Sequence, residues 1–226
     1  MTTTVTEVVQ MTLVPNADNS IIAESTKIMA EQKGCLAVRS FRWLEDPSRL
    51  EYFIDWDSIE SHINFARNEE VYLPFRARIG SVMAAYNQPF HVPLPPYPPA
   101  LLESQDGAGK SSVKAVGQAW FAGGVGFPSE RMESVSAAFQ GFVDAVRGEQ
   151  PVGFSGKVAA GWAKETIVRK AEVFRLFFFV MGWDSVEAHT RYRDSDHYKQ
   201  AISAITNLED FNELEFHHVG AADVSS

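Results

Sequence analysis

One sequence pattern occurs twice in this chain and constrains its fold more than any other feature. An apolar run leads into Trp-Asp-Ser, followed by an apolar residue, Glu, a small residue and His, at 52–62 and again at 177–189. Ser58 and Ser185 are typical N-terminal caps of helices, so each copy predicts a strand that turns directly into a helix. Two copies, 127 positions apart, predict an internal duplication.

The elements expected around the two copies follow one order: strand, helix, strand, strand, helix, strand. Alternating patterns, caps and breakers place them at 6–14, 19–33, 36–44, 49–56, 58–86 and 90–92, and again at 113–121, 129–147, 154–162, 171–183, 185–206 and 213–219. Phe90-His91 matches Phe216-His217, which implies a one-residue insertion in one half. Gln10 on the first strand matches Gln118.

The two halves define the expected domain organisation. Residues 1–92 form the first repeat and residues 113–220 form the second. A Pro-rich linker at 93–112 separates them, because its prolines exclude a helix or a central strand. The tail at 221–226 is expected to be disordered.

Composition excludes several classes of function. No apolar run approaches the length of a membrane span, and the N-terminus has no signal-peptide pattern. The single cysteine, Cys35, fits a reducing compartment, so we expect a cytoplasmic protein. A net charge of −9 argues against a nucleic-acid partner. No phosphate-binding loop, dinucleotide fingerprint or metal-ligand spacing occurs, so we expect no cofactor and no metal.

This β-α-β-β-α-β order, with Trp-Asp-Ser-x-Glu at the exit of the third strand, resembles the dimeric α+β barrel superfamily. Within that superfamily, the chain is most similar to the antibiotic-biosynthesis-monooxygenase branch. The second half continues that pattern with Tyr192, Ser195 and His197-Tyr198, whereas the first half departs from it at Asn68 and Val71. The resemblance implies an α+β fold in which two ferredoxin-like repeats form a barrel within one chain, and it allows a homodimer of whole chains.

The resemblance and the residue types together predict the site. The resemblance places a catalytic His at His197, and Tyr192 shares its helical face. His189, on the helix after Trp-Asp-Ser, is the alternative base, although a packing role for it is the commoner outcome. The expected substrate-binding residues are polar or aromatic side chains. Gln10 on a strand and His62 on a helix belong to the first half, and the strands of the second half contribute Gln118, Trp120 and Trp162.

These observations predict a cofactor-independent monooxygenase-like enzyme of secondary metabolism. It would act on a small aromatic or polyketide-like substrate by His-assisted deprotonation. A non-redox cyclase or isomerase, a non-catalytic ligand-binding or stress-response barrel, and a haem-binding protein remain alternatives, because the fold hosts all of them. We expect the working pocket in the second repeat, with His197 facing it, and the first repeat with His62 and Gln10 as the other location.

Overall fold

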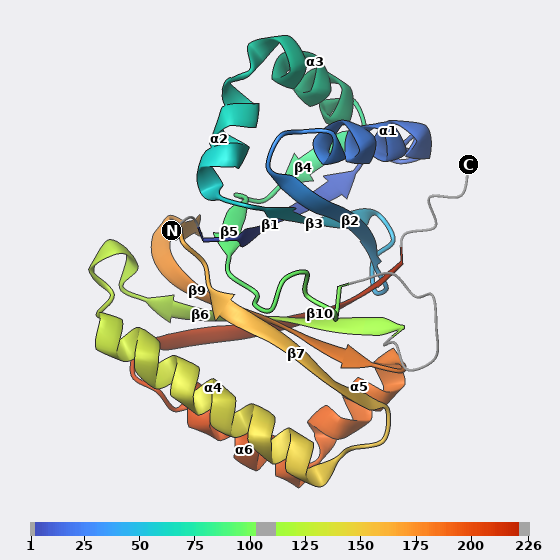
Figure 1. Ribbon diagram of the computed structural model, residues 1–226. Helices are drawn as coiled ribbons and strands as arrows, with labels where there is room; N and C mark the ends of the chain where they lie inside the picture. Colours follow the sequence, from blue (N-terminus) through green and yellow to red (C-terminus); the bar gives the residue numbers. More distant parts are fainter. Residues whose placement is uncertain (1–2, 103–111, 222–226) are drawn as a thin grey trace. The chain divides into compact units, whose positions relative to one another are not determined.

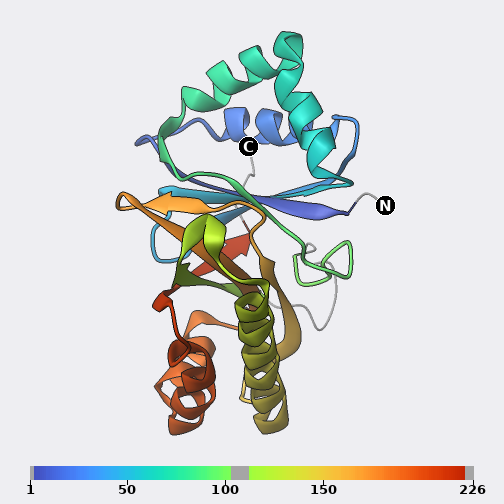
Figure 2. The same cartoon turned by 90° about the vertical axis from the view of Figure 1, so that its left-hand side faces the viewer.

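The computed structural model describes residues 3–102 and 112–221, which divide into two compact units (Figures 1 and 2). Residues 3–102 with 219–221 form the first unit and residues 112–218 the second; we call them the first and second repeat. Each has a sheet with helices on one face, so the predicted α+β class with two ferredoxin-like repeats is confirmed. Residues 103–111 of the predicted linker, and the predicted tail from 222 onward, lie outside the described residues.

The first repeat contains eight of the described elements. They are β1 (Val5–Leu13), α1 (Asn19–Ala30), β2 (Cys35–Trp43), β3 (Arg49–Trp56), α2 (Ile59–Arg67), α3 (Glu69–Gly80), β4 (Met83–Tyr86) and β5 (Phe90–Val92). The strands are antiparallel in the order β4–β1–β3–β2; β5 also pairs with β1, and Val219–Ala221 pairs with β2. Helices α1, α2 and α3 cover one face of this sheet (Figure 1).

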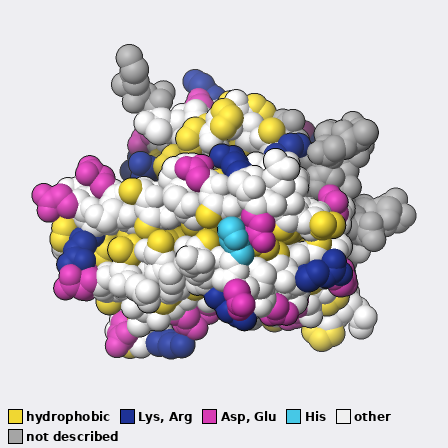
Figure 3. Space-filling view, turned by 90° about the horizontal axis from the view of Figure 1, so that it is seen from below, with side chains coloured by type: hydrophobic (Ala, Val, Ile, Leu, Met, Phe, Trp, Pro, Cys, Tyr) yellow, Lys and Arg dark blue, Asp and Glu magenta, His cyan; other side chains and the backbone are white. Residues whose placement is uncertain are grey.

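The second repeat has the same plan, with a longer first helix and a longer third strand. Its elements are β6 (Val113–Ala122), the 3-10 turn Gly124–Gly126, α4 (Ser129–Glu149), β7 (Phe154–Trp162), β8 (Ile167–Arg169), β9 (Glu172–Trp183), α5 (Val186–Asp194), α6 (Asp196–Thr206) and β10 (Phe211–Ala221). The strand order is β10–β6–β9–β7, and β8 pairs with β9. Figure 3 looks onto the α4–α6 side, where apolar side chains lie between scattered acidic and basic groups. None of the described helices combines the length and apolar character needed to cross a bilayer.

The duplicated motif builds the same turn in both repeats. The Ser58 and Ser185 hydroxyls accept hydrogen bonds from the backbone N–H groups of Ser61 and Ala188, at 3.2 and 3.1 Å, as N-caps do. Gly34 and Gly153 lie beside these turns with φ of +85° and +87°. A Cβ on Gly34 would meet Ser61 Oγ at 2.4 Å, so both backbone conformation and space favour glycine there.

The two motif tryptophans are the anchors of their repeats. Trp56 and Trp183 are both fully buried, each at the end of its strand, which confirms the predicted core role. The β1–β3 pairing sets Val5 opposite Trp56, and the β6–β9 pairing sets Val113 opposite Trp183. This register makes the two repeats comparable residue by residue.

Three local predictions were wrong. Residues 83–86 form strand β4 rather than the end of a helix, because they extend the edge of the sheet beside β1. Pro128, rather than Ser129, is the N-cap of α4, and Ser129 is its first residue. Strand β8 at 167–169 was not predicted, because three residues are too short for a visible alternation.

The expected match of His91 with His217 was also wrong. His62 contacts His91, and His189 contacts His218; each pair is 29 residues apart. His91 therefore corresponds to His218, and these motifs require no insertion between them.

The register generates a stability prediction. Truncating Trp56 or Trp183 to Ala should lower the free energy of unfolding by about 3–5 kcal/mol, because each change opens a cavity in a packed core. Chemical denaturation of each variant beside the unaltered chain measures this loss. An unchanged midpoint in Trp183→Ala would contradict the core assignment.

Candidate functional site

A cavity of about 370 Å³ lies within the first repeat, between its sheet and its helices. Its wall is mostly aromatic and aliphatic, with contributions from β1, β3 and all three helices, and includes Val9, Tyr52, Trp56, Phe65, Tyr72 and Phe75. A volume of this size falls within the range of small-molecule sites, about 300–1,000 Å³. The cavity therefore suits a small aromatic ligand.

Strand alternation decides which side chains reach the cavity. Glu7, Val9 and Met11 of β1 all line it. Tyr52 and Trp56 of β3 do the same, because residues two apart share one face of a strand. Glu7 and His62 are the only carboxylate and the only imidazole among the lining residues.

Aromatic rings occupy the corresponding region of the second repeat. By register, Gly117 corresponds to Val9 and Phe179 to Tyr52. The Phe179 ring covers Gly117 so closely that a Cβ there would be 2.1 Å from it. Phe139 and Phe216 pack on the same ring, with centroids at 4.8 and 5.6 Å. At this position the second repeat is filled by a ring where the first repeat has its cavity.

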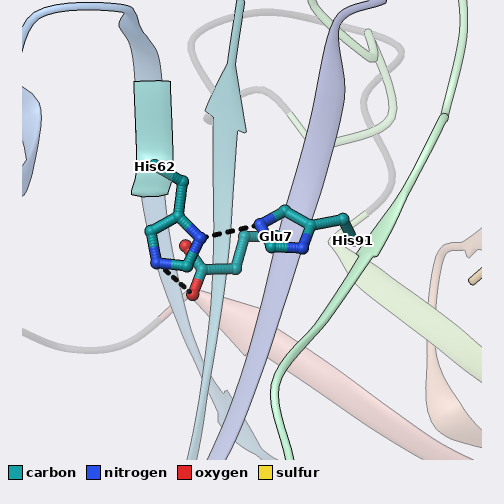
Figure 4. A group of neighbouring side chains, drawn as sticks. All are labelled: Glu7, His62 and His91. Atoms are coloured by element: carbon teal, nitrogen blue, oxygen red, sulfur yellow. Dashed lines mark hydrogen bonds and ion pairs between the residues drawn. The ribbon is translucent and has the colours of Figure 1, made fainter. Parts of the chain in front are cut away.

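Three polar side chains from three elements meet at the cavity wall: Glu7 of β1, His62 of α2 and His91 of β5 (Figure 4). His62 Nδ1 lies 2.8 Å from His91 Nε2, a hydrogen bond whose donor depends on the tautomer. His62 Nε2 lies 3.5 Å from Glu7 Oε1, beyond hydrogen-bond distance but close enough for an ion pair. We call this group the Glu7–His62–His91 cluster.

Trp56 contacts two members of the cluster, Glu7 and His62. Its indole N–H donates to Glu7 Oε2 at 2.9 Å, and its ring stacks on His62 with centroids 5.4 Å apart and planes at 25°. Because Glu7 is buried and carries a hydrogen bond on one oxygen, its second oxygen is fixed toward His62. Trp56 is therefore part of both the hydrophobic core and the candidate site.

The second repeat has the same imidazole pair without the carboxylate. His189 Nδ1 lies 2.7 Å from His218 Nε2, and His189 packs against Trp183 with ring centroids 5.0 Å apart. By register, Ala115 stands where the first repeat has Glu7. The buried Trp183 Nε1 consequently has no hydrogen-bond acceptor among the described residues.

The donor set of the cluster resembles a metal-binding set, with ligand atoms within 4.8 Å of one another. Chelation requires three lone pairs that converge on one point. Here His62 directs one nitrogen to His91 and the other to Glu7, so the three groups form a chain (Figure 4). This arrangement suits proton transfer better than chelation.

The residues predicted as catalytic belong to the second repeat, and none of them lines this cavity. His197 is half-exposed on α6, where its Nδ1 lies 3.2 Å from Glu149 Oε2. Tyr192 is buried beside Trp183, with ring centroids 5.7 Å apart, and burial raises its pKa to about 12. The catalytic roles of His197, His189 and Tyr192 remain predictions.

Of the predicted substrate-binding residues, only His62 lines the cavity. Gln10 alternates with Val9, so it points to the opposite face of the sheet, where it donates to Glu51 at 2.9 Å. Gln118 and Trp120 likewise alternate with the helix-facing residues of β6. Their substrate-binding roles remain predictions.

Trp162, the remaining predicted substrate-binding residue, packs against the core of the second repeat. Its indole N–H donates to the Met132 carbonyl at 3.1 Å, and its ring contacts Phe121 and Phe177. It therefore contributes to the filled interior of that repeat, and a substrate-binding role for it remains a prediction.

Sequence reasoning missed Glu7 and the pairing of His91. Glu7 interrupts an otherwise apolar face of β1, and His62 and His91 recur with the spacing of His189 and His218. An acid on a core-facing strand position was the available signal.

Comparison with solved structures places the fold among monooxygenase-like proteins. A proposed monooxygenase from Fusobacterium nucleatum subsp. nucleatum superposes with a TM-score of 0.61 and 12% identity, covering 97% of this chain and 92% of its own. A proposed monooxygenase from Lactobacillus acidophilus gives 0.57 and 12%, covering 96% and 93%. An anthrone oxidase-like protein gives 0.60 and 18%, covering 96% and 90%.

At identities this low, the superpositions establish a shared fold and nothing about chemistry. The fold-level resemblance inferred from the sequence is confirmed. No protein-family profile matches the sequence, and no curated protein is detectably similar to it. The chemistry is therefore argued from the site.

The buried imidazole of the second repeat generates a pH prediction. Burial lowers the pKa of His189 to about 3, and the nearby His218 and Arg193 act in the same direction. Folded His189 stays neutral, whereas the unfolded chain binds a proton below about pH 6.5. The free energy of unfolding should therefore fall as the pH drops from about 6.5, by up to about 1.4 kcal/mol per pH unit.

Urea unfolding at several pH values between about 7 and 5 measures this slope. The His189→Gln variant should be less stable throughout and should show a shallower slope. Equal slopes in the two proteins would contradict the assignment of the slope to His189.

Proposed function

We propose that this chain is a cofactor-independent, monooxygenase-like enzyme of secondary metabolism that binds an aromatic or polyketide-like molecule in the cavity of the first repeat. His62 is the base that takes a proton from the substrate. The observation that carries the proposal is an imidazole, flanked by a buried carboxylate, in the wall of an aromatic cavity. Histidine is the usual proton acceptor near neutral pH, and such residues in apolar clefts are typical of catalytic sites.

The reaction begins with deprotonation of a phenol or of an activated CH₂ group. Loss of this proton gives an electron-rich anion that molecular oxygen can oxidise. Overall, CH₂ and O₂ become C=O and water, so the substrate supplies all the electrons and the balance requires no separate reductant. The similarity to an anthrone oxidase-like protein supports a substrate with such a CH₂ group between aromatic rings.

The proposed base is His62 in preference to His197. His62 lines an apolar cavity, where exclusion of water strengthens its interactions with a substrate anion. His197 is half-exposed and its side chain lies beside Glu149, so the two residues are placed as a surface ion pair. The two histidines therefore provide the two arms of a direct test.

A non-redox cyclase or isomerase is the second candidate function. Arg76 also lines the cavity, and its guanidinium could stabilise the oxygen of an enolate that is then trapped by carbon rather than by oxygen. Both reactions share the deprotonation step. Oxygen consumption separates them, because only the oxidation uses one O₂ for each product molecule.

The test uses anthrone as the probe and an oxygen electrode as the readout. The unaltered chain should consume oxygen with anthrone, and His62→Ala should lower kcat by about 10²–10⁴-fold, as loss of a positioned base does. His197→Ala is the matched control and should retain activity. A large loss in His197→Ala with full activity in His62→Ala would move the site to the second repeat.

Other outcomes favour the alternatives. Conversion of the probe without oxygen uptake would indicate the non-redox function. Binding of the probe with no conversion would indicate a ligand-binding protein.

A further inference from the structure

We propose that the ligand of the first-repeat cavity is an aromatic acid, whose carboxylate pairs with the guanidinium of Arg76 while its rings occupy the apolar interior. This inference names the substrate class of the proposed function and rests on it for turnover, but the binding step can be measured with a compound that does not react. It is carried by the place of Arg76 on α3 and by its lack of an acidic partner among the described residues.

Arg76 lies on the face of α3 that borders the cavity. Four residues of this helix line the cavity: Tyr72, Phe75, Arg76 and Ile79. Their spacing of three and four residues places them on one side of the helix, whereas Leu73, on another side, is 55% exposed. Apolar residues are the usual occupants of a helix face that covers an interior, so the arginine is unusual at this position.

The cavity reaches solvent beside Arg76. The Arg76 side chain is exposed although it lines the cavity, and Tyr86 of β4, another lining residue, is 54% exposed. The guanidinium therefore keeps contact with water and carries its charge without the cost of burial. A ligand carboxylate at this opening stays partly hydrated, while the rest of the ligand leaves water.

Arg76 has no acidic partner among the residues that the structure describes. The chain contains 29 acidic residues against 20 Lys and Arg, so acids are abundant. Two other arginines of α2 and α3 do have such partners. Arg67 Nη1 lies 3.6 Å from Glu60 Oε1, and Arg78 pairs with Glu24. The Arg76 guanidinium is therefore available to an anion that enters with a ligand.

Glu7 determines which way such a ligand enters. It is the only carboxylate among the lining residues, and its oxygens face the Trp56 indole and His62. A ligand carboxylate is repelled by Glu7 and attracted by Arg76, so the ring system is directed toward His62. A single guanidinium balances one negative charge, which favours a carboxylate over a phosphate group with up to two charges.

The second repeat shows that the backbone plan does not require an arginine here. The cluster histidines and their counterparts are 127 positions apart, and so are the first residues of α3 and α6. This offset assigns Ser203 to the position of Arg76. The cation therefore belongs to the repeat with the cavity, and it is replaced where the Phe179 ring closes the interior.

The experiment compares the binding of two anthraquinones of equal shape to the full chain. Anthraquinone-2-carboxylate is the charged probe, and anthraquinone-2-carboxamide is its neutral control. Neither has the CH₂ group that the proposed reaction requires, so neither is consumed. Isothermal titration calorimetry at low salt should give a dissociation constant about tenfold lower for the acid, because a hydrogen bond between two charged groups is stronger than one to a neutral group. Added salt should reduce this difference, because it screens charges near solvent.

Three variants locate the effect. Arg76→Gln should weaken binding of the acid by about tenfold and leave the affinity for the amide within about twofold. Arg76→Lys should retain part of the preference, because lysine keeps the charge and loses the bidentate geometry. Arg78→Gln is the matched control, because Arg78 belongs to the same helix, pairs with Glu24 and is not a lining residue, so both affinities should be unchanged. The amide affinity also reports that each variant is folded.

Equal affinities of the unaltered chain for the acid and the amide, or equal losses of both in Arg76→Gln, would overturn the assignment. A preference for the acid that Arg76→Gln removes, with no oxygen uptake from anthrone or anthrone-2-carboxylate, would retain the aromatic-acid site and reject the proposed function. Oxygen uptake with anthrone and no preference for the acid would do the reverse, so the two failures are distinguishable.

Discussion

The hydrogen bond from the Trp56 indole to the buried carboxylate of Glu7 is the interaction on which the first repeat's site depends. A carboxylate removed from water is costly unless its oxygens have partners. Trp56 satisfies one oxygen, and His62 stands near the other. Because the same Trp ends β3 and stacks on His62, the residue that closes the core also sets the position of the proposed base. Trp56 therefore contributes both to core packing and to the position of the proposed base.

The two repeats use one backbone plan for two different interiors. Val9 and Tyr52 leave a cavity in the first repeat, whereas Gly117 admits the Phe179 ring and closes the same region in the second. A filled interior stabilises by dispersion and by burial of apolar area, whereas an open one gives up part of that gain to hold a ligand. A duplicated chain can accept this loss in one repeat because the other retains a packed core.

The sequence predicted the strand-to-helix turns and the buried tryptophans because each depends on a local pattern, such as the cap at Ser58 or the strand ending at Trp183. It did not predict where the cavity lies, because that depends on long-range packing, such as the contact of Phe179 with Gly117. The local pattern favours His197 because it extends the motif, whereas Glu7 of β1 and His62 of α2 come together only through the packing of a helix on the sheet. Gln10 was placed in a pocket although alternation with Val9 directs it to the other face.

In the proposed function, the first repeat holds the substrate and directs its reactive carbon to His62. A crystal structure of the chain with anthrone bound under anaerobic conditions tests this most directly. We expect anthrone in the cavity beside Trp56, with its CH₂ carbon about 3–3.5 Å from His62 Nε2. Anthrone bound in the second repeat beside His197, with the first-repeat cavity empty, would contradict it.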